Sequence, residues 1–259
     1  MEFTGRVAIV TGAGQGIGRA IALEFARLGA AVGVADLNGE TAESVAEEVR
    51  ALGRRGIAKT VDVSKKQQVE DLVRGVSEEL GGLDIMVNNA GIVIVERFLD
   101  LTEEQWDRAF SVNTKGVLFG VQAAGRFMVD AGTKGRIVNM SSVAGKSGRP
   151  LLAAYAASKA AIINLTQSAA QALAPHRITV NCICPGVVDA PMGESALAQM
   201  SKLTADGKVT QEQSGVPPAP LGPTASPEDV ARMVAYLAGP GGEYITSQSI
   251  NVDGGRCVL

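Results

Sequence analysis

The sequence predicts an α/β fold with a doubly wound parallel sheet and helices on both of its faces. Short β-type runs alternate with longer helical stretches, most of the runs are apolar throughout, and no internal repeat is present. Strands of a parallel sheet are apolar because both of their faces are buried. The chain has 259 residues, of which 46% are hydrophobic, which is enough for a single domain over residues 1–259.

The elements of this alternation can be placed in order along the chain. Apolar residues recur at helical spacing in residues 19–28 and 41–52, after the first and second strands. Capping signals mark two further helix starts, at Thr102 and at Ser226. The runs that predict strands are residues 7–11, 31–35, 57–63, 83–87, 136–140 and 178–183.

Residues 187–225 interrupt the alternation with a long connection rich in glycine and proline. A connection of this length inside a compact domain is usually functional. We therefore expect a substrate lid at about 187–225. Its polar side chains could hydrogen-bond a small polyhydroxy compound beside a few apolar anchors; they are Ser195, Gln199, Ser201, Thr204 and Gln211, and the anchors are Met192, Leu197 and Met200.

Charge and hydropathy exclude several classes of partner. The 24 basic and 27 acidic residues give a net charge of -3, so nucleic acid and anionic membranes are not expected partners. No apolar run approaches the roughly 18 residues of a membrane span. The chain enters a strand pattern without the pattern of a signal peptide, so we expect a cytoplasmic protein.

The three cysteines are Cys182, Cys184 and Cys257, and the single histidine is His176. This set predicts neither a disulfide framework nor a metal site. Cys182 and Cys184 lie in an apolar strand, so we expect both to be buried. Trp106 is expected in the core and His176 on the surface, and neither is assigned a function.

A glycine-rich turn, TGAGQGIG at residues 11–18, joins the first strand to the following helix. Glycines at such a turn bring the helix N-terminus close to a pyrophosphate, although a tight connection without a ligand can have the same composition. Here the second strand ends in Asp36, 18 residues after Gly18, where a carboxylate would accept a hydrogen bond from an adenosine ribose. The combination favours a dinucleotide site.

Asp36 also favours NAD over NADP. A 2′-phosphate about 4 Å from this carboxylate would add a repulsion of roughly 4 kcal/mol per unit charge. No neighbouring cation could offset this repulsion, because Gln15, Leu37 and Asn38 are uncharged. We therefore predict NAD as the cofactor.

Tyr155 and Lys159 are four residues apart at the start of a helical stretch, so they share one face of the helix. A tyrosine with a pKa near 10 is a poor base at neutral pH, and lowering that pKa by about 3 units takes about 4 kcal/mol. An adjacent ammonium and a nicotinium ring are suitable sources. Ser142 follows the fifth strand and could hydrogen-bond the reacting oxygen. By itself such a Tyr–Lys pair is more often a surface pair on an amphipathic helix.

These residues occur together with further motifs, and the whole set resembles the short-chain dehydrogenase/reductase family over essentially the full chain. The resemblance implies a Rossmann-type domain whose sheet has about seven strands, the seventh near residues 248–252, and usually a homotetramer. The residues and segments that carry it are Thr11–Gly18, Asn88–Gly91, Asn113, Ser142, Tyr155–Lys159 and Pro185–Gly186.

The resemblance also implies a catalytic set. Tyr155 is the acid/base, Lys159 binds the nicotinamide ribose and lowers the tyrosine pKa, and Ser142 polarises the substrate oxygen. Asn113 would hold a water in a proton relay through Lys159. A helix-interior asparagine satisfied by local hydrogen bonds is an equally good interpretation of Asn113 from the sequence alone.

The cofactor contacts implied by the resemblance include Asp62 against adenine at the end of the third strand. Asn88 is expected to tie neighbouring strands. Many members have a threonine ahead of the Pro-Met pair that follows Ala190, so the anchoring of the carboxamide differs here. The expected cofactor-binding residues are Gly12, Gln15, Gly16, Ile17, Gly18, Asp36, Leu37, Asp62, Val63, Asn89, Ala90, Gly91, Tyr155, Lys159, Pro185, Gly186 and Val188.

The expected function is NAD-dependent hydride transfer between the nicotinamide and a secondary alcohol or ketone, with a small polyol, diol or sugar as substrate. Within the family the resemblance is closest to enzymes acting on sorbitol, butanediol and diacetyl. Against a diol, Val143 stands where some diol enzymes have a glutamine. The alternatives are a 3-oxoacyl thioester reductase, a hydroxysteroid-type dehydrogenase, a dinucleotide-binding protein without catalysis, and a structural scaffold.

Overall fold

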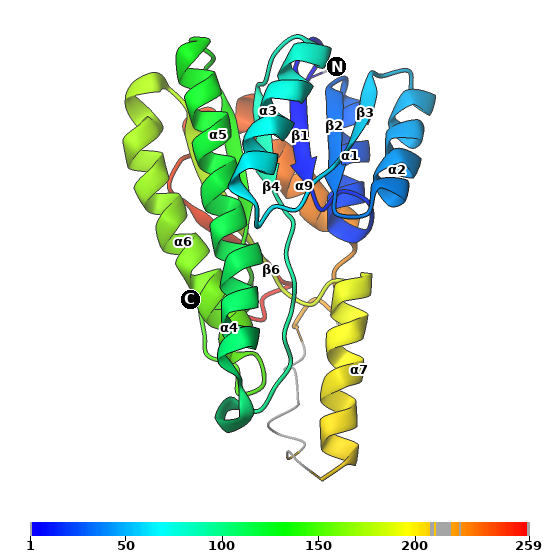
Figure 1. The fold of residues 1–259 in the computed structure, drawn as a ribbon, viewed down its shortest axis with the longest axis vertical. Helices are drawn as coiled ribbons and strands as arrows, with labels where there is room; N and C mark the ends of the chain where they lie inside the picture. Colours follow the sequence, from blue (N-terminus) through cyan, green and yellow to red (C-terminus); the bar gives the residue numbers. More distant parts are fainter. Residues whose placement is uncertain (1, 208–209, 211–218, 223, 258–259) are drawn as a thin grey trace.

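The computed structural model describes residues 2–207, 210, 219–222 and 224–257, which form a parallel sheet between two layers of helices (Figure 1). The seven strands lie in the order β3-β2-β1-β4-β5-β6-β7, and every neighbouring pair is parallel. The strand order reverses between β1 and β4, which opens a crevice at the carboxyl edge of the sheet. The strands are β1 (Val7–Thr11), β2 (Ala31–Asp36), β3 (Gly56–Thr60), β4 (Ile85–Asn88), β5 (Arg136–Met140), β6 (Thr179–Pro185) and β7 (Ser249–Val252).

The helices complete the predicted alternation. Short 3₁₀ turns lie at Phe98–Asp100, Val143–Gly145, Ala174–His176 and Pro240–Gly242, and a π-helical turn, Phe110–Lys115, joins α4 to α5. The helices are α1 (Gly16–Leu28), α2 (Gly39–Ala51), α3 (Lys66–Leu80), α4 (Glu103–Ala109), α5 (Gly116–Asp130), α6 (Ala153–Leu173), α7 (Pro191–Ala205) and α9 (Pro227–Ala238).

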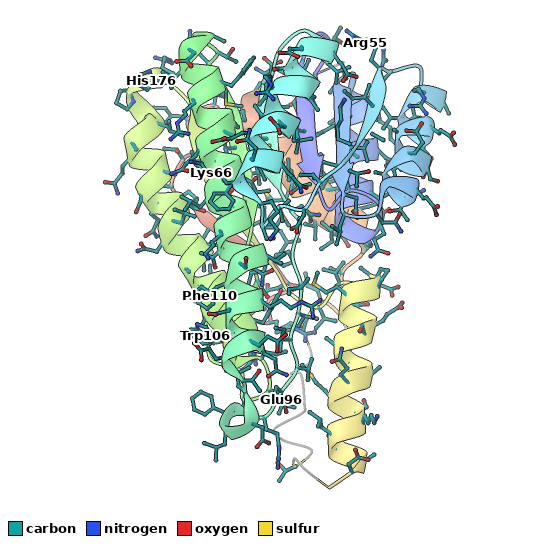
Figure 2. The ribbon with its side chains drawn as sticks, viewed as in Figure 1. Arg55, Lys66, Glu96, Trp106, Phe110 and His176 are labelled. Carbon is teal, nitrogen blue, oxygen red and sulfur yellow. The ribbon has the colours of Figure 1, made fainter. Side chains whose placement is uncertain are left out.

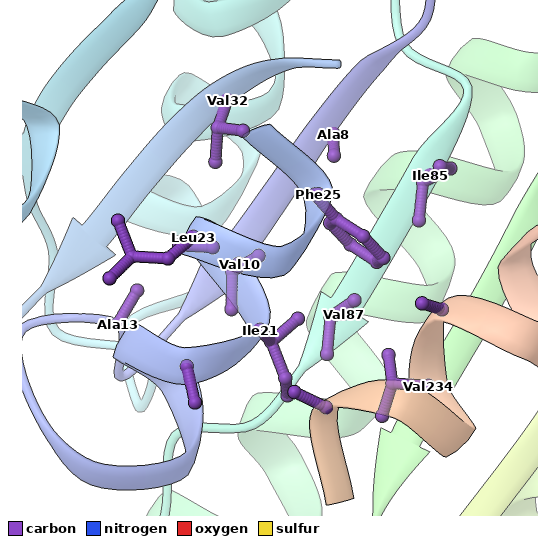
Figure 3. Close-up of a cluster of buried hydrophobic side chains, with 14 of the residues drawn as sticks. Ala8, Val10, Ala13, Ile21, Leu23, Phe25, Val32, Ile85, Val87 and Val234 are labelled. Atoms are coloured by element: carbon purple, nitrogen blue, oxygen red, sulfur yellow. The ribbon is translucent and has the colours of Figure 1, made fainter. Parts of the chain in front are cut away.

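The apolar strands bury both faces of the sheet. Alternate residues of β1 belong to different core clusters, Ala8 and Val10 to one and Val7 and Ile9 to the other. The first cluster contains side chains of α1, α2 and α9, and Figure 3 shows α1 residues lying over β1 and β4. The second cluster contains side chains of α3, α5 and α6. The expected doubly wound sheet is therefore confirmed.

Both predicted capping signals are confirmed. The Thr102 hydroxyl accepts from the Gln105 backbone N–H, while the Gln105 side chain accepts from the Thr102 N–H. The Ser226 hydroxyl accepts from the Asp229 N–H, and the Asp229 carboxylate accepts from the Ser226 N–H. These reciprocal bonds satisfy donors that a helix N-terminus leaves open.

The third strand is shorter than predicted, because β3 ends at Thr60 and not at Val63. The Asp62 carboxylate accepts hydrogen bonds from the backbone N–H and the hydroxyl of Ser64, at 2.9 and 2.7 Å. An aspartate that bonds the backbone two residues on turns the chain locally. Asp62 and Val63 therefore lie beyond the end of the strand.

Trp106 is not a core residue, which corrects the sequence prediction. Its side chain is 40% exposed and stacks on Phe110 with ring centroids 4.7 Å apart (Figure 2). The helical pattern of α4 gave no sign that this turn lies at the edge of the molecule. His176 is exposed as predicted, and Cys182 and Cys184 are buried.

The segment 187–225 contains a helix, α7, and is not irregular throughout. In Figure 1 this helix extends away from the sheet at the lower end of the molecule. Residues 208–209, 211–218 and 223 of the predicted lid lie outside the described residues. Within the part of the chain that the structure describes, no helix combines the length and the hydropathy needed to span a membrane.

Candidate active site

A cavity of about 1170 Å³ opens at the carboxyl edge of the sheet. Its walls come from the turn after β1, from the ends of β2, β4, β5 and β6, and from α4, α6 and α7. This position, beside the reversal of strand order between β1 and β4, is where open α/β sheets bind ligands.

The glycine turn brings the backbone close to this cavity. Gly12 has a φ of +61°, and a β-carbon there would lie 2.8 Å from the Ala90 Cα. A β-carbon at Gly18 would collide with the carbonyl oxygen of Gly12. The N-cap residue of α1, Gln15, makes no side-chain capping bond, so the first turn of the helix keeps its donors for a ligand.

Residues after β4 hold this turn in place. The Asn89 side-chain amide donates to the carbonyls of Thr11 and Gly12 at 2.9 and 3.0 Å. The Thr11 hydroxyl accepts from the backbone N–H groups of Asn89 and Ala90 at 3.0 and 3.1 Å. Asn88 donates to Asn139 at 2.8 Å, which ties β4 to β5 as expected. The turn is therefore fixed by bonds across two neighbouring strands.

Asp36 closes the second strand beside the glycine turn. One carboxylate oxygen accepts from the Gly14 N–H at 2.9 Å, and the other accepts from the Asn38 N–H at 3.0 Å. Both Asp36 and the exposed Leu37 line the cavity. Each carboxylate oxygen has a second lone pair for a ribose hydroxyl.

Tyr155 and Lys159 lie in the first two turns of α6 and share one face, as predicted. The ammonium of Lys159 is 5.6 Å from the centre of the Tyr155 ring and donates to the Met140 carbonyl at 2.7 Å. Ser142 lies two residues beyond β5, is near enough to Tyr155 to oppose the rise of its pKa, and accepts from the Ala144 N–H at 3.1 Å. The three side chains line the same part of the cavity.

The electrostatics of this group differ from the sequence prediction. Burial raises the pKa of Tyr155, and the nearby Cys184 adds to the rise, while the Ser142 hydroxyl opposes it. Burial also lowers the pKa of Lys159 to about 8. The chain alone therefore does not lower the tyrosine pKa, because desolvation outweighs the interactions that favour the phenolate.

Asn113 is fully buried in the π-helical turn and does not line the cavity. Its side-chain oxygen accepts from the Ile92 N–H at 2.8 Å. Its amide donates to the Ile92 carbonyl at 3.0 Å and to the Ser158 hydroxyl at 2.9 Å. Ser158 in turn donates to the Tyr155 carbonyl at 2.7 Å. Local hydrogen bonds thus account for this side chain, and they connect it to the helix turn that carries Tyr155.

The other predicted site residues come together in one place. All of the expected cofactor-binding residues line the cavity, together with Ser142. Of the lid residues predicted on α7, the apolar anchors Met192, Leu197 and Met200 line it. Ser195, Gln199, Ser201 and Thr204 do not, and Ser195 accepts a hydrogen bond from Gln199 at 3.2 Å. Gln211 lies outside the described residues.

Three arginines, Arg108, Arg149 and Arg256, line the cavity and were not identified from the sequence. They come from α4, from the connection before α6 and from the segment after β7. No local motif distinguishes them from other surface arginines. Only the folded chain brings them to one opening.

Comparisons with known proteins agree with this geometry. The family model described as short chain dehydrogenase matches residues 6–201. The chain is 47% identical over 253 residues to a short-chain dehydrogenase/reductase of Armillaria gallica, covering 97% of this chain and 95% of the relative. It is 40% identical to a galactitol 2-dehydrogenase of Agrobacterium fabrum, covering 99% of each. The crystal structure of NAD⁺-bound xylitol dehydrogenase superposes with a TM-score of 0.92 at 33% identity, covering 98% of this chain and all of that one.

Proposed function

Because the chain belongs to the short-chain dehydrogenase family, we propose that it transfers hydride between NAD and a secondary alcohol or the matching ketone. The observation that carries this function is the group of Ser142, Tyr155 and Lys159 on one wall of the cavity. A binding protein or scaffold has no need for a buried lysine beside a half-buried tyrosine that lines the cavity. The chain is therefore an oxidoreductase acting on CH–OH groups.

The cavity fits a dinucleotide. The Gly12 backbone approaches Ala90 more closely than any side chain would allow, and the first turn of α1 offers donors to a pyrophosphate. Asp36 would accept from the ribose hydroxyls at the far end, which favours NAD over NADP. Bound nicotinamide supplies the hydride acceptor or donor.

The side chains of the protein then handle the proton. In oxidation, the ionised Tyr155 oxygen accepts the proton of the substrate hydroxyl and becomes a phenol, and in reduction the phenol returns that proton to the ketone oxygen. The Ser142 hydroxyl donates a hydrogen bond to the same substrate oxygen. Lys159 holds positive charge next to the tyrosine. If its ammonium moved from the Met140 carbonyl toward a bound ribose, that charge would act on the reacting groups.

Asn113 is proposed as a positioning residue for this group. Its side chain bonds Ser158, which bonds the backbone of Tyr155, so it fixes the first turn of α6. A π-helical turn shifts the hydrogen-bond pattern and is frequent at functional sites. The proposed water relay would use the backbone of this turn, since the side chain is already bonded.

The proposed substrate is a small polyol, diol or sugar. The support comes from the similarity to the galactitol and xylitol enzymes. The apolar lining of α7, with Met192, Leu197 and Met200, favours a second candidate, a 3-oxoacyl thioester reductase or hydroxysteroid-type dehydrogenase. The preference for NAD at Asp36 counts against the thioester reductase, because that activity generally uses NADPH.

We also propose that α7 and its flanking residues act as the lid over 187–225. α7 has one buried residue, Met200, and its N-cap Ala190 provides no capping bond. An element held by few buried contacts opens at low free energy. A β-carbon at Gly16 would lie 3.4 Å from the Ala190 Cβ, so the base of this helix adjoins the glycine turn. Binding of NADH with a substrate analogue should slow hydrogen exchange in Pro191–Ala205, and unchanged exchange would contradict the lid.

The assembly and the location are further parts of the proposal. The family resemblance supports a homotetramer, which multi-angle light scattering would test. The cytoplasmic location expected from the sequence would be tested by cell fractionation.

The substrate class is tested by a panel of polyols, vicinal diols, sugars, steroids and acetoacetyl thioesters scored by NADH absorbance. A polyol, diol or sugar should give the highest kcat/KM with NAD. A thioester or bulky hydrophobic ketone turned over at least about a hundredfold better would move the assignment to the second candidate.

A further inference from the structure

Two half-buried arginines meet in the cavity on the side of the catalytic group. Arg149 lies in the connection between Ser142 and Tyr155, and its backbone carbonyl accepts from the Leu152 N–H at 3.1 Å. Arg256 follows β7, where the preceding Asp253 packs against Gly186. Both arginines therefore belong to segments that border the catalytic residues, although more than 100 positions separate them in the sequence.

Both arginines line the same cavity, and the positive charge of Arg149 acts on Arg256. The pKa of Arg256 is lowered first by burial and then by the charge of Arg149, with Asp253 partly opposing this. The Asp253 carboxylate is itself used to accept from the Gly255 and Cys257 N–H groups, at 3.0 and 2.7 Å. Two like charges brought together in a half-buried wall are costly, and an anion bound between them would offset that cost.

Arg149 has its guanidinium available for such an anion. Among the described residues, its side chain takes part in no ion pair and no side-chain hydrogen bond. Other arginines of this chain are paired, such as Arg19 with Glu48 and Arg232 with Asp229. A planar guanidinium that lines a cavity matches the two oxygens of a carboxylate or phosphate.

We propose that Arg149 and Arg256 form an anion subsite at the substrate end of the cavity, so that the hydroxy substrate carries a carboxylate or a phosphate group. This inference rests on the proposed function, because it assigns a further group to the substrate of the same site. The reacting hydroxyl lies at Tyr155 and Ser142, and the oxyanion lies between the two arginines. The substrate is then a polyol or sugar that also bears an acidic group, such as a sugar acid or a phosphorylated polyol.

Acidic residues also line the cavity, and their negative charges disfavour an anionic substrate. Glu103, Glu104 and Asp107 line it from α4, together with Arg108, and all four side chains are exposed. Water and salt screen charges in exposed positions more than charges in half-buried ones. The arginine pair therefore determines the field where the substrate binds, and the α4 acids act at the mouth.

Calorimetric titration of the NAD⁺-loaded protein tests the subsite without depending on turnover. The three probes are D-gluconate, D-sorbitol 6-phosphate and neutral D-sorbitol. At least one anionic probe should bind about tenfold or more tightly than sorbitol, and the preference should shrink as salt is raised. Comparing gluconate with sorbitol 6-phosphate identifies the carboxylate or the phosphate as the recognised group.

Substitutions then locate the anion. R149Q and R256Q should each reduce the preference about tenfold, R149K and R256K should retain part of it, and R126Q on the exposed face of α5 should leave it unchanged. Sorbitol binding as tightly as both anions, or a preference unaffected by R149Q and R256Q, would overturn the subsite. If anions bind and Arg149 controls them, but no hydroxy compound reduces NAD⁺, the subsite stands and the proposed reaction is wrong.

Discussion

The cofactor end of the cavity is built from successive strand ends, whereas the substrate end gathers segments that are far apart in the sequence. The cofactor end consists of residues 11–18, 36–37, 61–64 and 89–91. The substrate end consists of α4, the connection 143–152, α7 and Arg256. The cofactor end is therefore defined by backbone turns, and the substrate end by the side chains that point into the cavity.

The two ends also differ in how firmly they are held. At the cofactor end, four hydrogen bonds join Asn89 and Ala90 after β4 to Thr11 and Gly12 at the end of β1. Asn38 caps α2 through the Glu40 and Thr41 N–H groups. At the substrate end, α7 starts without a side-chain cap and buries one residue. The cofactor end is therefore held by more hydrogen bonds than the start of α7, which is consistent with the proposed lid at the substrate end. Four predictions test this comparison.

The largest effect is expected where the two ends meet, at Tyr155. Y155F should lower kcat by about a thousandfold, because the ring stays and the transferable proton is lost. NADH affinity, measured by fluorescence, should stay within about twofold, because the cofactor end is untouched. Since burial raises the tyrosine pKa, the wild-type oxidation rate should increase with pH as the phenol ionises.

The control for Y155F is Y244F, which removes the hydroxyl of a fully exposed tyrosine and should leave kcat unchanged. Retention of even about a tenth of the wild-type kcat in Y155F would show that the base lies elsewhere.

The next largest effect tests the charge of Asp36 at the cofactor end of the cavity. Wild-type kcat/KM should favour NAD over NADP, and D36A combined with L37R should shift the ratio toward NADP by about a hundredfold or more, since a repulsion is removed and a cation added. L37R alone separates the two contributions. Equal use of both cofactors by the wild-type enzyme would contradict the role of Asp36.

A third prediction concerns the buried charge of Lys159, whose pKa of about 8 lies below the ordinary lysine value of 10.5. Between these values the unfolded chain binds more protons than the folded one, so stability rises with pH. Relative to K159M, the wild-type free energy of unfolding should therefore increase by about 3 kcal/mol from pH 8 to pH 10.5.

Urea unfolding of both proteins across this range measures the change, and K66M serves as the control for loss of an exposed lysine. A wild-type stability that fell relative to K159M over the same interval would show that the folded protein stabilises the ammonium.

The smallest effects compare the two helix starts directly. N38A should destabilise α2 by about 1 kcal/mol, because it removes two capping bonds, whereas A190S should stabilise α7 by about 0.5–1 kcal/mol by adding one. Hydrogen exchange followed by mass spectrometry resolves the two helices. Unchanged protection of α7 in A190S would mean that its start is already held by other contacts.

The sequence alone determined the fold and most of the cofactor end. Strand positions followed from apolar runs, and glycine spacing with Asp36 located the dinucleotide turn, because these features depend on neighbours along the chain. The same local rules placed both caps correctly at Thr102 and Ser226. The predicted third strand was too long, because the Asp62 side chain hydrogen-bonds the backbone beyond the end of β3 and so competes with strand pairing.

The substrate end depends on tertiary packing that no local sequence pattern reveals. The hydroxyl and amide residues expected to face the cavity from α7 turn away from it, while Met192, Leu197 and Met200 face inward. The rotation of a helix about its axis depends on what it packs against, and α7 has too few buried contacts for its own pattern to reveal this. The meeting of Arg149 with Arg256 and the raised pKa of Tyr155 likewise arise from burial and from long-range proximity, which no local pattern encodes.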